Sequence, residues 1–491
     1  MRVYLINPPR IHPRSWGEPS VSQPIELAYS AAVLEGHHKV VVLDAPGEGW
    51  REVHEIDSKR YRVGLRGEEI AYRIKSWSPD IVGIHIPFSG WSEMAFEIAK
   101  LVKLIDSEII TVMDGVHPSA RPVDCLLDEN VDFVIIGEAE ETWFELVNAL
   151  ENGCETYKLK EIPGIGFKEN GNIVFTPPRH FIQDLDRLPF PARHLLPMEA
   201  YFEAVRKNPL RGEIKKPWTM MITSRGCPYH CIFCTAHITR GRQWRGRSPE
   251  NVVAEIEHVV EKYHVKQIDF HDDNMTFDKK RMAKICDLIV ERGLDIEWFT
   301  PNGIRADTLD RELLLKMKKS GCRRIYLAPE SGVQRVVNSI IKKNLDLKTV
   351  EKAVALSRKI GIKVACFFII GLIGETKEDI EATIKFAYRL KELGADKFYF
   401  SYATPVYGTE LYTQAIEGGY LIKDFSDQAL SAVEPLIETP EFTVEELRVL
   451  CARANLINLE LTPDKFKKAL HNPIKAIKFL LNKLTEKLQN A

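Results

Sequence analysis

The chain has 491 residues, 45% of them hydrophobic and 28% charged, an ordinary composition for a soluble globular protein of about two to four domains. Its 67 lysines and arginines nearly balance 69 aspartates and glutamates, so no overall charge recruits nucleic acid or an anionic membrane. No apolar run approaches the ~20 residues of a membrane helix, and the start, MRVYLINPPR, is too short and strand-like for a signal peptide. Together with an odd cysteine count, nine, these features predict a cytoplasmic protein, which we expect to be a monomer.

Strands and helices alternate through residues 1–150. Short, β-branched and almost continuously apolar segments predict strands at residues 3–6, 39–43, 81–86, 109–113 and 133–136. Helical segments lie between them, at residues 25–34, 91–102 and 141–150. This order predicts an α/β domain with a parallel, doubly wound, Rossmann-like sheet. No G-x-G-x-x-G sequence follows the first strand, which argues against an ordinary dinucleotide site.

Ligands of such sheets bind at the carboxyl ends of the strands. There the chain reads NPP from Asn7, PFS from Pro87, DGVHP from Asp114 and GEAE from Gly137. Taken alone, these loops are equally compatible with ordinary turns, and a single His117 is more often structural than a ligand.

Residues 151–216 are expected to connect two domains. The sequence NGN at 170–172 and the apolar residues 173–175 predict one arm of a hairpin. Proline-rich segments at 177–178 and 188–191 are typical of rigid linkers. We therefore place a domain boundary in this region.

The alternation of strands and helices resumes in residues 217–430. Strands are expected at residues 219–223, 267–270, 296–300, 324–328, 364–370 and 397–402. Helix N-caps are expected at Ser248, Asp278, Asp346 and Thr376, and helix ends at Gly293, Gly321, Gly361 and Gly394. Six strand–helix units predict a partial (β/α)6 barrel, with its chemistry on the loops that follow the strands.

The last region, residues 431–491, is expected to be helical. Near the end, apolar residues recur at steps of three and four and form one stripe, opposite a lysine-rich face: Phe466, Leu470, Ile474, Ile477, Leu481, Leu484 and Leu488. We expect a helix docked on the protein surface; a helix that binds a membrane surface or a partner protein is the alternative.

The densest chemistry follows the first barrel strand, in the sequence SRGCPYHCIFC. Its cysteines, Cys227, Cys231 and Cys234, have the spacing C-x3-C-x2-C. Three thiolates on one loop can bind three irons of a four-iron cluster and leave the fourth iron open to a small molecule, whereas electron-transfer clusters usually have four cysteine ligands. Zinc completed by His230 or His237, a disulfide, and buried inert cysteines are the alternatives. A cluster with an open iron is oxygen-sensitive, which predicts an anaerobic setting.

This spacing, with the aromatic Phe233 before the last thiol, resembles the signature of radical S-adenosylmethionine (SAM) enzymes. The ends of the later barrel strands resemble the SAM-binding edges of the subclass with an N-terminal cobalamin domain: HDDN from His271, NGIR from Asn302, PESG from Pro329, IIGLIGET from Ile369 and TPVYGT from Thr404. The resemblance covers about residues 1–430 and implies a cobalamin-dependent (class B) radical SAM methyltransferase.

The resemblance also implies a role for each matching residue of the barrel. The cluster ligands would be Cys227, Cys231 and Cys234. The amino, carboxylate and ribose groups of SAM would be bound by Asp272, Asp273, Asn274, Arg305, Glu330 and Ser331. Near adenine we expect Phe233, Ile369 and Tyr402. Tyr402 and Tyr407 are candidates for positioning the substrate, while Arg305 and Asp273 could instead form structural ion pairs.

Three loops of the first domain resemble those that border the corrin ring of cobalamin in this subclass. The residues that the resemblance implies there are Asn7, Gln23, Pro24, Ile25, Pro87, Phe88, Ser89, Asp114, Gly115, Val116, His117, Gly137, Glu138 and Glu140. The D-x-H-x-x-G motif, whose histidine coordinates cobalt in cobalamin-dependent mutases, is absent because His117 lies three residues after Asp114. We therefore expect base-off cobalamin without a histidine below cobalt. Asp114 replaces a glycine of the family loop, a departure that bears on how the corrin fits.

The implied reaction transfers a methyl group from methylcobalamin to an unactivated carbon, after a 5′-deoxyadenosyl radical has removed a hydrogen atom from that carbon. Two alternative functions are compatible with the same motifs. One is a non-methylating oxidation or ring closure, and the other is a cobalamin-binding regulator with an inactive barrel. The substrate is expected to be a small molecule, a lipid or a peptide side chain. The layout is compatible with the glutamine C-methyltransferase of methyl-coenzyme M reductase. An electron donor such as ferredoxin or flavodoxin is the expected partner.

An arginine-rich run, RGRQWRGR, occupies residues 240–247. A basic rim around the substrate is one interpretation of this run, and a solvated loop is the other.

Overall fold

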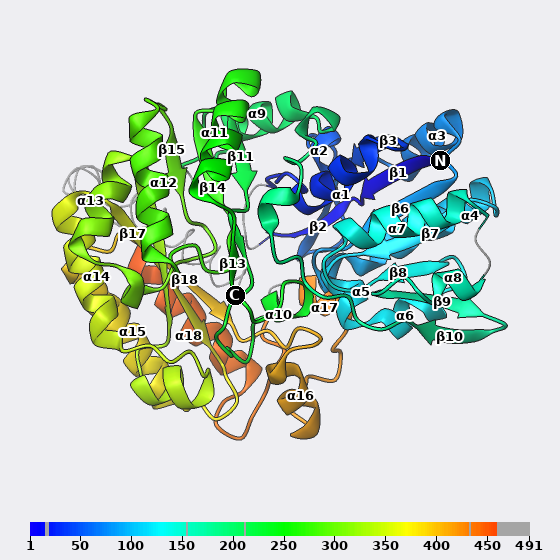
Figure 1. The fold of residues 1–491 in the computed structure, drawn as a ribbon. Helices are drawn as coiled ribbons and strands as arrows, with labels where there is room; N and C mark the ends of the chain where they lie inside the picture. The colour runs from blue at the N-terminus through cyan, green and yellow to red at the C-terminus, as the bar shows by residue number, and fades with distance from the viewer. Residues whose placement is uncertain (15–18, 154–155, 211–212, 432–433, 459–491) are drawn as a thin grey trace, which may run out of the picture.

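The structure, a computed structural model, describes residues 1–14, 19–153, 156–210, 213–431 and 434–458. Two main sheets lie side by side, one built by the N-terminal part of the chain and one by residues 218–402, and helices cover both (Figure 1). Within the described ranges, the helices are too short or too polar to cross a membrane.

The first sheet has seven strands in the order β10-β9-β8-β7-β6-β1-β3. These are β1 (Arg2–Asn7), β3 (Lys39–Asp44), β6 (Ile81–His85), β7 (Ile110–Asp114), β8 (Phe133–Ile135), β9 (Ile165–Glu169) and β10 (Asn172–Phe175). The first five, all expected from their apolar sequences, pair in parallel. The chain proceeds from β1 to β3 on one side and then to β6 on the other. The switch point of this doubly wound sheet therefore lies between β1 and β6.

Helices cover both faces of this sheet. One face packs against α1 (Ile25–Glu35) and α7 (Glu140–Glu151), and the other against α3 (Gly67–Trp77), α4 (Ser92–Ile105) and α6 (Pro122–Leu127). Burial on both faces explains why the central strands lack an alternating pattern, since neither face is left to solvent.

The sheet continues past residue 150, into the stretch that we expected to be a connector. There β9 and β10 form an antiparallel hairpin on the edge of the sheet, and α8 (Thr156–Leu159) and α9 (Met198–Lys207) precede and follow it. A second antiparallel sheet, not predicted, consists of β2 (Arg10–Pro13), β5 (Arg60–Val63) and β4 (Val53–Glu55). Its strands have only three or four residues each and carry charged side chains, so they lack a detectable apolar period. The short helices α2 (Ala45–Glu48) and α5 (Val116–Ala120) complete this domain.

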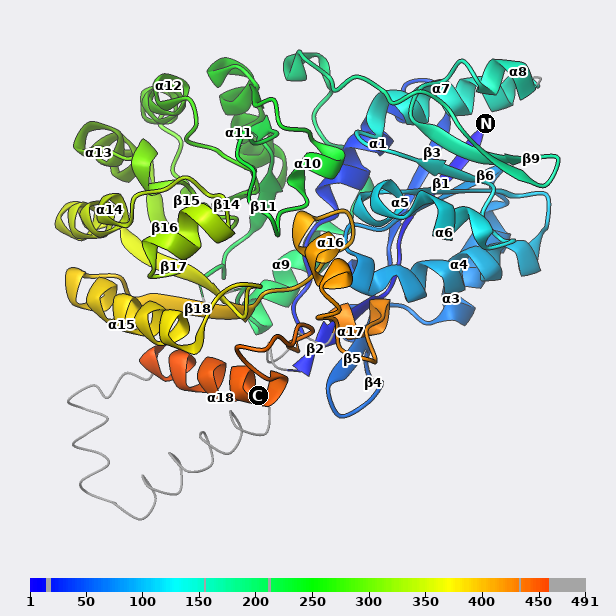
Figure 2. The same ribbon diagram turned by 90° about the horizontal axis from the view of Figure 1, so that it is seen from below.

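The second main sheet contains the six predicted barrel strands, all parallel and in chain order. They are β11 (Trp218–Met221), β14 (Gln267–Phe270), β15 (Glu297–Phe299), β16 (Cys322–Glu330), β17 (Lys363–Ile370) and β18 (Lys397–Tyr402). The strands β11 and β18 form the two edges, so the sheet is a partial barrel whose open side faces the first domain (Figure 2).

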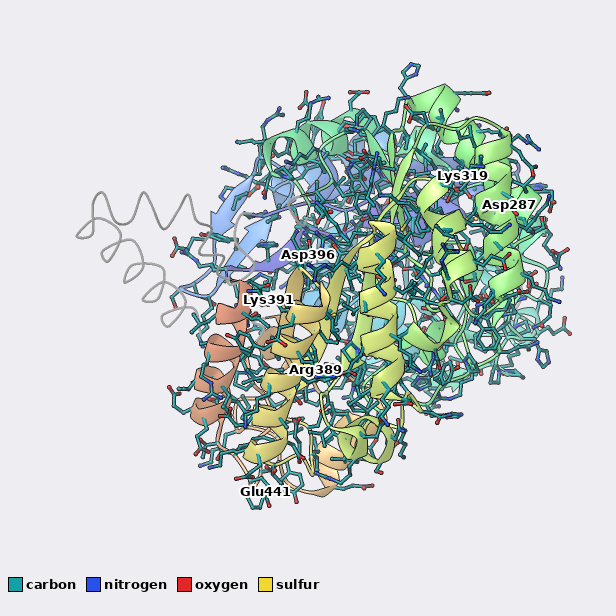
Figure 3. All side chains as sticks on the ribbon, turned by 90° about the vertical axis from the view of Figure 1, so that its left-hand side faces the viewer. Asp287, Lys319, Arg389, Lys391, Asp396 and Glu441 are labelled. Carbon is teal, nitrogen blue, oxygen red and sulfur yellow. The ribbon has the colours of Figure 1, made fainter. Side chains whose placement is uncertain are left out.

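Five helices cover the outside of the barrel: α11 (Pro249–Tyr263), α12 (Lys279–Glu291), α13 (Arg311–Lys319), α14 (Leu347–Ile360) and α15 (Lys377–Leu393). The four expected N-caps are confirmed, because their side chains accept hydrogen bonds from backbone N–H groups of the first helical turn. The outer faces are charged, as Asp287 on α12, Lys319 on α13 and Arg389 on α15 illustrate (Figure 3).

The C-terminal region contains α16 (Glu410–Glu417), α17 (Asp427–Ser431) and α18 (Val444–Asn455). The helix α17 contacts the first domain, where the Ser92 hydroxyl donates to Asp427 at 2.5 Å. The helix α18 packs against β18, and beyond it the Asn458 side chain hydrogen-bonds both backbone groups of Phe398, at 2.7 and 3.0 Å. Residues 434–443 are not helical, unlike our expectation for this region. The apolar stripe from Phe466 to Leu488 lies outside the described residues.

Candidate active site

The cysteine loop begins just after β11, and its conformation depends on a glycine. Cys227, Cys231 and Cys234 are unpaired, partly exposed thiols. Gly226 has a φ of +81°, and a Cβ at this position would lie 2.2 Å from the backbone oxygen of Gln243. Only glycine fits such a position, so the residue before the first thiol fixes the path of the loop.

The arrangement of the three thiols is compatible with a four-iron cluster. In the part of the chain that the structure describes, no group of three or more His, Cys, Asp or Glu side chains is arranged to hold a metal ion. A four-iron cluster does not need such convergence, because each thiolate binds a different iron. Burial raises the pKa of all three thiols, that of Cys234 to about 12. Metal binding would stabilise the thiolate forms, since thiolates are the metal ligands.

Asp272 and Asp273 follow β14, and both hold the cysteine loop. The Asp272 carboxylate accepts hydrogen bonds from the Thr223 backbone N–H at 2.8 Å and from its hydroxyl at 2.6 Å. Asp273 accepts from the Gly226 N–H at 2.8 Å and pairs with Arg240 at 3.2 Å. Both carboxylates thus bind protein groups of the loop, and for Asp273 the structural ion pair is the arrangement observed.

Arg305, expected to bind the SAM carboxylate, is engaged within the protein. Its guanidinium pairs with Asp307 at 2.6 and 3.0 Å and donates to the backbone oxygens of Lys343 at 2.9 Å and Asn344 at 2.7 Å. It also stacks on the Tyr229 ring, 3.6 Å from the centroid. Four of its five N–H groups donate to these acceptors, so the structural ion pair is again observed.

Glu330 and Ser331 lie at the end of β16 and are buried. The Glu330 carboxylate accepts from the Lys343 ammonium at 2.7 Å, and the Ser331 hydroxyl lies 2.9 Å from that of Thr383. Sequence reasoning missed Lys343, because nothing in the sequence IIKKNLDL distinguishes a buried lysine from an exposed one.

The side chains expected around SAM partly converge beside the thiols. The Asn274 amide donates to the Cys227 sulfur at 3.9 Å. Phe233 and Ile369 pack with Cys231 against one apolar cluster. The sequence motifs after β11, β14 and β17 therefore meet at the barrel mouth, as their positions after the strands predicted.

Tyr402 does not join this group. Side chains alternate between the faces of a strand, and Phe398 and Phe400 of β18 are buried toward the helices. Tyr402 shares their face and packs beside Cys451 of α18, where burial and the Cys451 thiol raise its pKa. Its side chain therefore lies on the helix side of β18, and the expected packing or backbone contact with adenine stays a prediction.

Phe88 and Tyr407 belong to an apolar cluster between the C-terminal region and the first domain. The Tyr407 hydroxyl donates to Asp427 at 2.6 Å, and its ring lies 6.2 Å from that of His117. Phe88 packs edge-on against Trp91, with centroids 5.8 Å apart. Tyr407 is therefore bonded to α17, and its expected role in positioning the substrate stays a prediction.

A cavity of about 210 Å³ lies where the carboxyl edge of the first sheet faces the barrel. Residues expected near the corrin line one side: Asn7, Gln23, Pro24, Ile25 and Pro87. Barrel residues line the other side: Met220, Ile222, His271 and Asn302. Because Asn7 ends β1 and Pro87 follows β6, the cavity lies at the switch point, where doubly wound sheets bind ligands.

Gln23 joins the two domains at this cavity. Its amide donates to the Trp218 backbone oxygen at 3.0 Å, and its side-chain oxygen accepts from the Thr219 hydroxyl at 2.8 Å. Both partners belong to β11, so the loop before α1 is fixed to an edge strand of the barrel.

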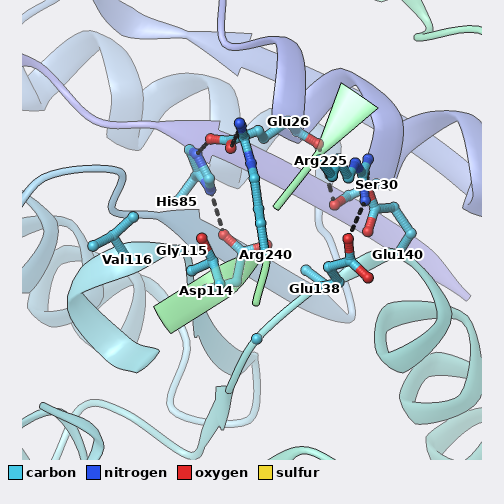
Figure 4. Close-up of a pocket in the computed structure, with 13 residues that line it drawn as sticks. Glu26, Ser30, His85, Asp114, Gly115, Val116, Glu138, Glu140, Arg225 and Arg240 are labelled. Carbon is cyan, nitrogen blue, oxygen red and sulfur yellow. Dashed lines mark hydrogen bonds and ion pairs between the residues drawn. The ribbon is translucent and has the colours of Figure 1, made fainter. Parts of the chain in front are cut away.

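A smaller cavity, of about 40 Å³, adjoins the first and shares Glu26, His85 and Arg240 with it (Figure 4). Arg240 pairs with Glu26, Glu26 lies 3.5 Å from His85 Nε2, and His85 Nδ1 lies 2.6 Å from Asp114. Burial alone would lower the pKa of His85, but Asp114 and Glu26 raise it to about 10. An imidazolium has no lone pair for a metal, so His85 in this arrangement serves as a hydrogen-bond donor between two carboxylates.

Glu138 and Glu140 follow β8 and pair with arginines beside the cysteine loop. Arg225, on β12 (Ser224–Arg225), pairs with Glu138 at 3.1 Å and with Glu140 at 2.5 Å. Arg245, on β13 (Arg245–Gly246), pairs with Glu138 at 2.9 Å. All four side chains are buried, so the loop expected at the corrin is joined to the loop of the cluster.

Ion pairs also show the environment of the arginine-rich run at residues 240–247. Arg240, Arg245 and Arg247 are largely enclosed and paired, Arg247 with the buried Glu255 of α11. Only Arg242 of the four is exposed. The solvated loop is therefore wrong for most of the run, in which Arg240 and Arg245 pair with carboxylates of the first domain, whereas the basic rim around the substrate stays a prediction.

Two of the remaining corrin-loop residues carry buried polar atoms without a partner in the described part of the chain. Both ring nitrogens of His117 and the hydroxyl of Ser89 are buried without a hydrogen-bond partner among the described residues. Such groups are rare in proteins, and neither residue lines either of the two cavities. Gly115, Val116 and Gly137 line the smaller cavity.

The loop after β17 carries a buried carboxyl group that makes folding pH-dependent. Glu375 accepts from the backbone N–H groups of Gly371 and Leu372, at 2.8 and 3.1 Å, while its other oxygen has no partner among the described residues. Burial raises the pKa of Glu375 to about 8, although the two hydrogen bonds lower it. The folded protein therefore holds a proton here that the unfolded chain releases above about pH 4.5.

We expect the free energy of unfolding to fall between about pH 4.5 and 8, by an amount on the order of 4 kcal/mol from this group. Glu375→Gln should remove that contribution, because the amide keeps the acceptor oxygen and cannot ionise. Urea unfolding at pH 5 and 8.5 measures the difference. The exposed Glu378→Gln is the control, and an equal pH dependence in both variants would contradict the assignment.

Comparison with known proteins identifies the family. Residues 221–387 match the Radical SAM superfamily, and residues 19–147 match the B12 binding domain. Over 456 residues the chain is 34% identical to an uncharacterized methyltransferase of Pyrococcus horikoshii, covering 92% of this chain and 91% of the relative. Over 477 residues it is 31% identical to the cytidylyl-2-hydroxyethylphosphonate methyltransferase of Streptomyces wedmorensis, covering 89% and 86%.

Solved structures share the fold. The cobalamin-dependent SAM radical enzyme OxsB superposes with a TM-score of 0.70 at 16% identity, covering 99% of this chain and 71% of its own. The radical SAM methyltransferase TsrM from Kitasatospora setae gives 0.67 at 18% identity, covering 85% and 75%. A B12 binding domain ahead of a partial barrel with three clustered cysteines defines a class of enzymes with two cofactor sites. This chain belongs to that family, the cobalamin-binding radical SAM enzymes.

Proposed function

We propose that this protein methylates an unactivated carbon of its substrate, with a [4Fe-4S] cluster and SAM at the barrel mouth and cobalamin at the sheet edge. When bound, the cluster and SAM supply a radical that removes a hydrogen atom, and cobalamin supplies the methyl group. One observation carries the proposal: Asn7 and Pro87 of the sheet edge line the same cavity as Met220 and His271 of the barrel. Relatives that are methyltransferases, covered over most of their length, support it.

The protein's own residues would bind, orient and enclose the reacting groups. Cys227, Cys231 and Cys234 would hold the cluster, on a loop that Asp272 and Asp273 keep in place. The apolar cluster between the C-terminal region and the first domain would keep water from one side of the site. Hydrogen leaves the substrate as an atom in this chemistry, so no general base is required.

The electron that this chemistry consumes must come from another protein. We propose a low-potential donor such as ferredoxin or flavodoxin, which would approach the partly exposed cysteine loop. The eight cysteines that the structure describes are unpaired thiols, which supports a reducing, cytoplasmic setting.

Transfer of an isotopic label tests the proposed function. Anaerobically reconstituted protein should contain about four irons and one cobalamin per chain. With a reductant and SAM that carries a deuterated methyl group, the label should appear in the product and 5′-deoxyadenosine should form. An altered but unlabelled product would favour oxidation or ring closure. No 5′-deoxyadenosine would favour a cobalamin-binding regulator.

Two substrates are the first to test. One is a nucleotidyl phosphonate, since the Streptomyces relative is named for cytidylyl-2-hydroxyethylphosphonate. The other is a glutamine-containing peptide of methyl-coenzyme M reductase, as the sequence layout suggested. Mass spectrometry of each after turnover identifies the methylated one.

A further inference from the structure

A pair of prolines places Arg10 at the boundary of the two domains. Asn7 ends β1, Pro8 and Pro9 follow, and Arg10 begins β2, which lies between the two main sheets (Figure 1). Each proline fixes its own φ, so this short connection has little conformational freedom. The backbone of Arg10 is therefore held in place at the edge where the first sheet faces the barrel.

Arg10 lines two cavities of that boundary. One is the cavity of about 210 Å³ at the switch point, and the other, of about 150 Å³, lies between β2 and the barrel strands β11 and β14. Both are lined by Arg10, Ser22, Met220 and His271, so they adjoin. Arg10 thus lies where the two cavities meet.

The Arg10 guanidinium lacks a counter-charge within the protein. Among the described residues its side chain forms no ion pair or hydrogen bond, and its Nε is buried without a partner. The group lies over the Trp91 ring, 5.8 Å from the centroid. Burial lowers the pKa of Arg10 to about 10, and the charge of Asp44 offsets only part of this. A cation in such a place destabilises the free protein unless an anion pairs with it.

Other charges on the walls of these cavities compensate one another. Glu26 pairs with Arg240 and lies 3.5 Å from His85 Nε2. His271 Nε2 lies 3.8 Å from the Asp269 carboxylate. Of the two arginines on these walls, Arg240 therefore has carboxylate partners, whereas Arg10 has none among the described residues.

A guanidinium without a partner defines the chemistry of its ligand. Its planar fork of N–H donors matches a carboxylate, phosphate or phosphonate group, which it binds through two parallel hydrogen bonds. We propose that Arg10 binds an anionic group of the substrate and thereby determines the substrate class. This assignment rests on the proposed function, in which the substrate occupies the cavity between the sheet edge and the barrel.

The phosphodiester of cobalamin is a second source of an anion with the same chemistry. The shape of the boundary favours the substrate, because the cavity of about 150 Å³ is lined by β2, β11 and β14 and by no described residue of the loops after β6, β7 and β8. Those are the loops expected at the corrin. Arg10 thus faces a space that leads away from them and into the barrel.

Three anions with matched uncharged esters test the assignment. They are 2-hydroxyethylphosphonate, 2-hydroxyethyl phosphate and 3-hydroxypropanoate, each compared with its fully methylated ester. Calorimetric titrations use protein that carries its cluster and cobalamin, anaerobically, without SAM or reductant and at constant ionic strength. Wild-type protein should bind at least one anion about 10-fold or more tightly than its ester, as expected for a charge-assisted pair. In Arg10→Met this preference should disappear, while affinity for the ester changes little.

Two further variants separate binding from structure. Arg14→Met removes an arginine of the same segment that pairs with Glu55 at 2.7 Å and lines neither cavity, so the preference should persist. Arg10→Lys should keep part of it, because an ammonium retains the charge but not the fork. Since no described carboxylate depends on Arg10, Arg10→Met should fold with a urea midpoint equal to or above that of wild-type protein.

A comparison of cobalamin with cobinamide identifies the source of the anion. Cobinamide lacks the nucleotide of cobalamin and therefore its phosphodiester. The ratio of the two affinities for the cobalamin-free protein should be the same in wild-type protein and in Arg10→Met. Loss of the advantage of cobalamin in Arg10→Met would assign Arg10 to cobalamin and overturn its role in substrate binding.

The remaining outcomes separate this assignment from the proposed function. An undiminished preference in Arg10→Met, or no preference for any of the three anions in wild-type protein, would overturn the role of Arg10. Equal weakening of anion and ester would also overturn it, because that result indicates a structural role. None of these measurements involves turnover, so a failure to transfer the deuterated methyl group would contradict the proposed function and leave the anion site intact.

Discussion

Replacement of Cys227, Cys231 and Cys234 by alanine should abolish reductive cleavage of SAM. In the proposed function the three thiolates are the cluster ligands, so the variant should hold no cluster and form no 5′-deoxyadenosine with a strong reductant. Cobalamin binding should persist, because its loops follow β6, β7 and β8 of the other sheet. Iron content, the absorbance of bound cobalamin and chromatography of the SAM products measure the three effects.

Cys286→Ala is the matched control for that experiment. Cys286 is buried on α12, away from the loop, and its loss should leave iron content and SAM cleavage unchanged. Reductive cleavage of SAM by the triple variant would contradict the assignment of the cluster. Loss of cobalamin together with iron would show that the two sites do not fold independently.

Arg225→Met should destabilise the protein by about 3–5 kcal/mol, the usual cost of breaking a buried ion pair from one side. The substitution leaves Glu140 buried without its partner and takes one of two arginines from Glu138. Because Arg225 lies two residues before Cys227, iron content should fall as well. Urea unfolding of the full chain measures the free energy, and iron analysis the second effect.

Two variants test whether the lost pairing is the cause. Arg242→Met removes an exposed arginine of the neighbouring segment and should change stability by less than about 1 kcal/mol. Arg225→Met combined with Glu140→Gln should recover part of the loss, because no unpaired carboxylate remains. Equal stability of the Arg225 and Arg242 variants would refute the proposed importance of this network.

Local sequence was sufficient for most of the fold. Apolar strands buried on both faces, and helices bounded by side-chain caps such as Thr376 and by Gly394, specify their own extents, and the structure confirms them. Alternation of strands and helices then leaves few possible topologies. The small sheet of β2, β4 and β5 escaped prediction because short charged strands have no apolar period.

The cysteines of the candidate site could be predicted from the sequence, whereas the contacts of its other residues mostly could not. The spacing of Cys227, Cys231 and Cys234 is local, so it could be read directly. The pairing of Arg225 with Glu138 joins residues 87 positions apart, and no local pattern encodes it. Tyr402 shares one face of β18 with Phe398 and Phe400, but the sequence does not say whether that face meets the helices or the barrel interior.

Arg240 pairs with Glu26 of the first domain and with Asp273 of the barrel, while Gln23 is bonded to β11. The contacts of Glu26 and Gln23 need matching partners from both halves of the chain. Exchange of one half for that of a distant homologue would separate these partners, so a working hybrid should require the arginine–carboxylate set to be transplanted as a unit. Recombination within this family is therefore expected to succeed at crossover points that keep these residues together, and to yield insoluble protein elsewhere.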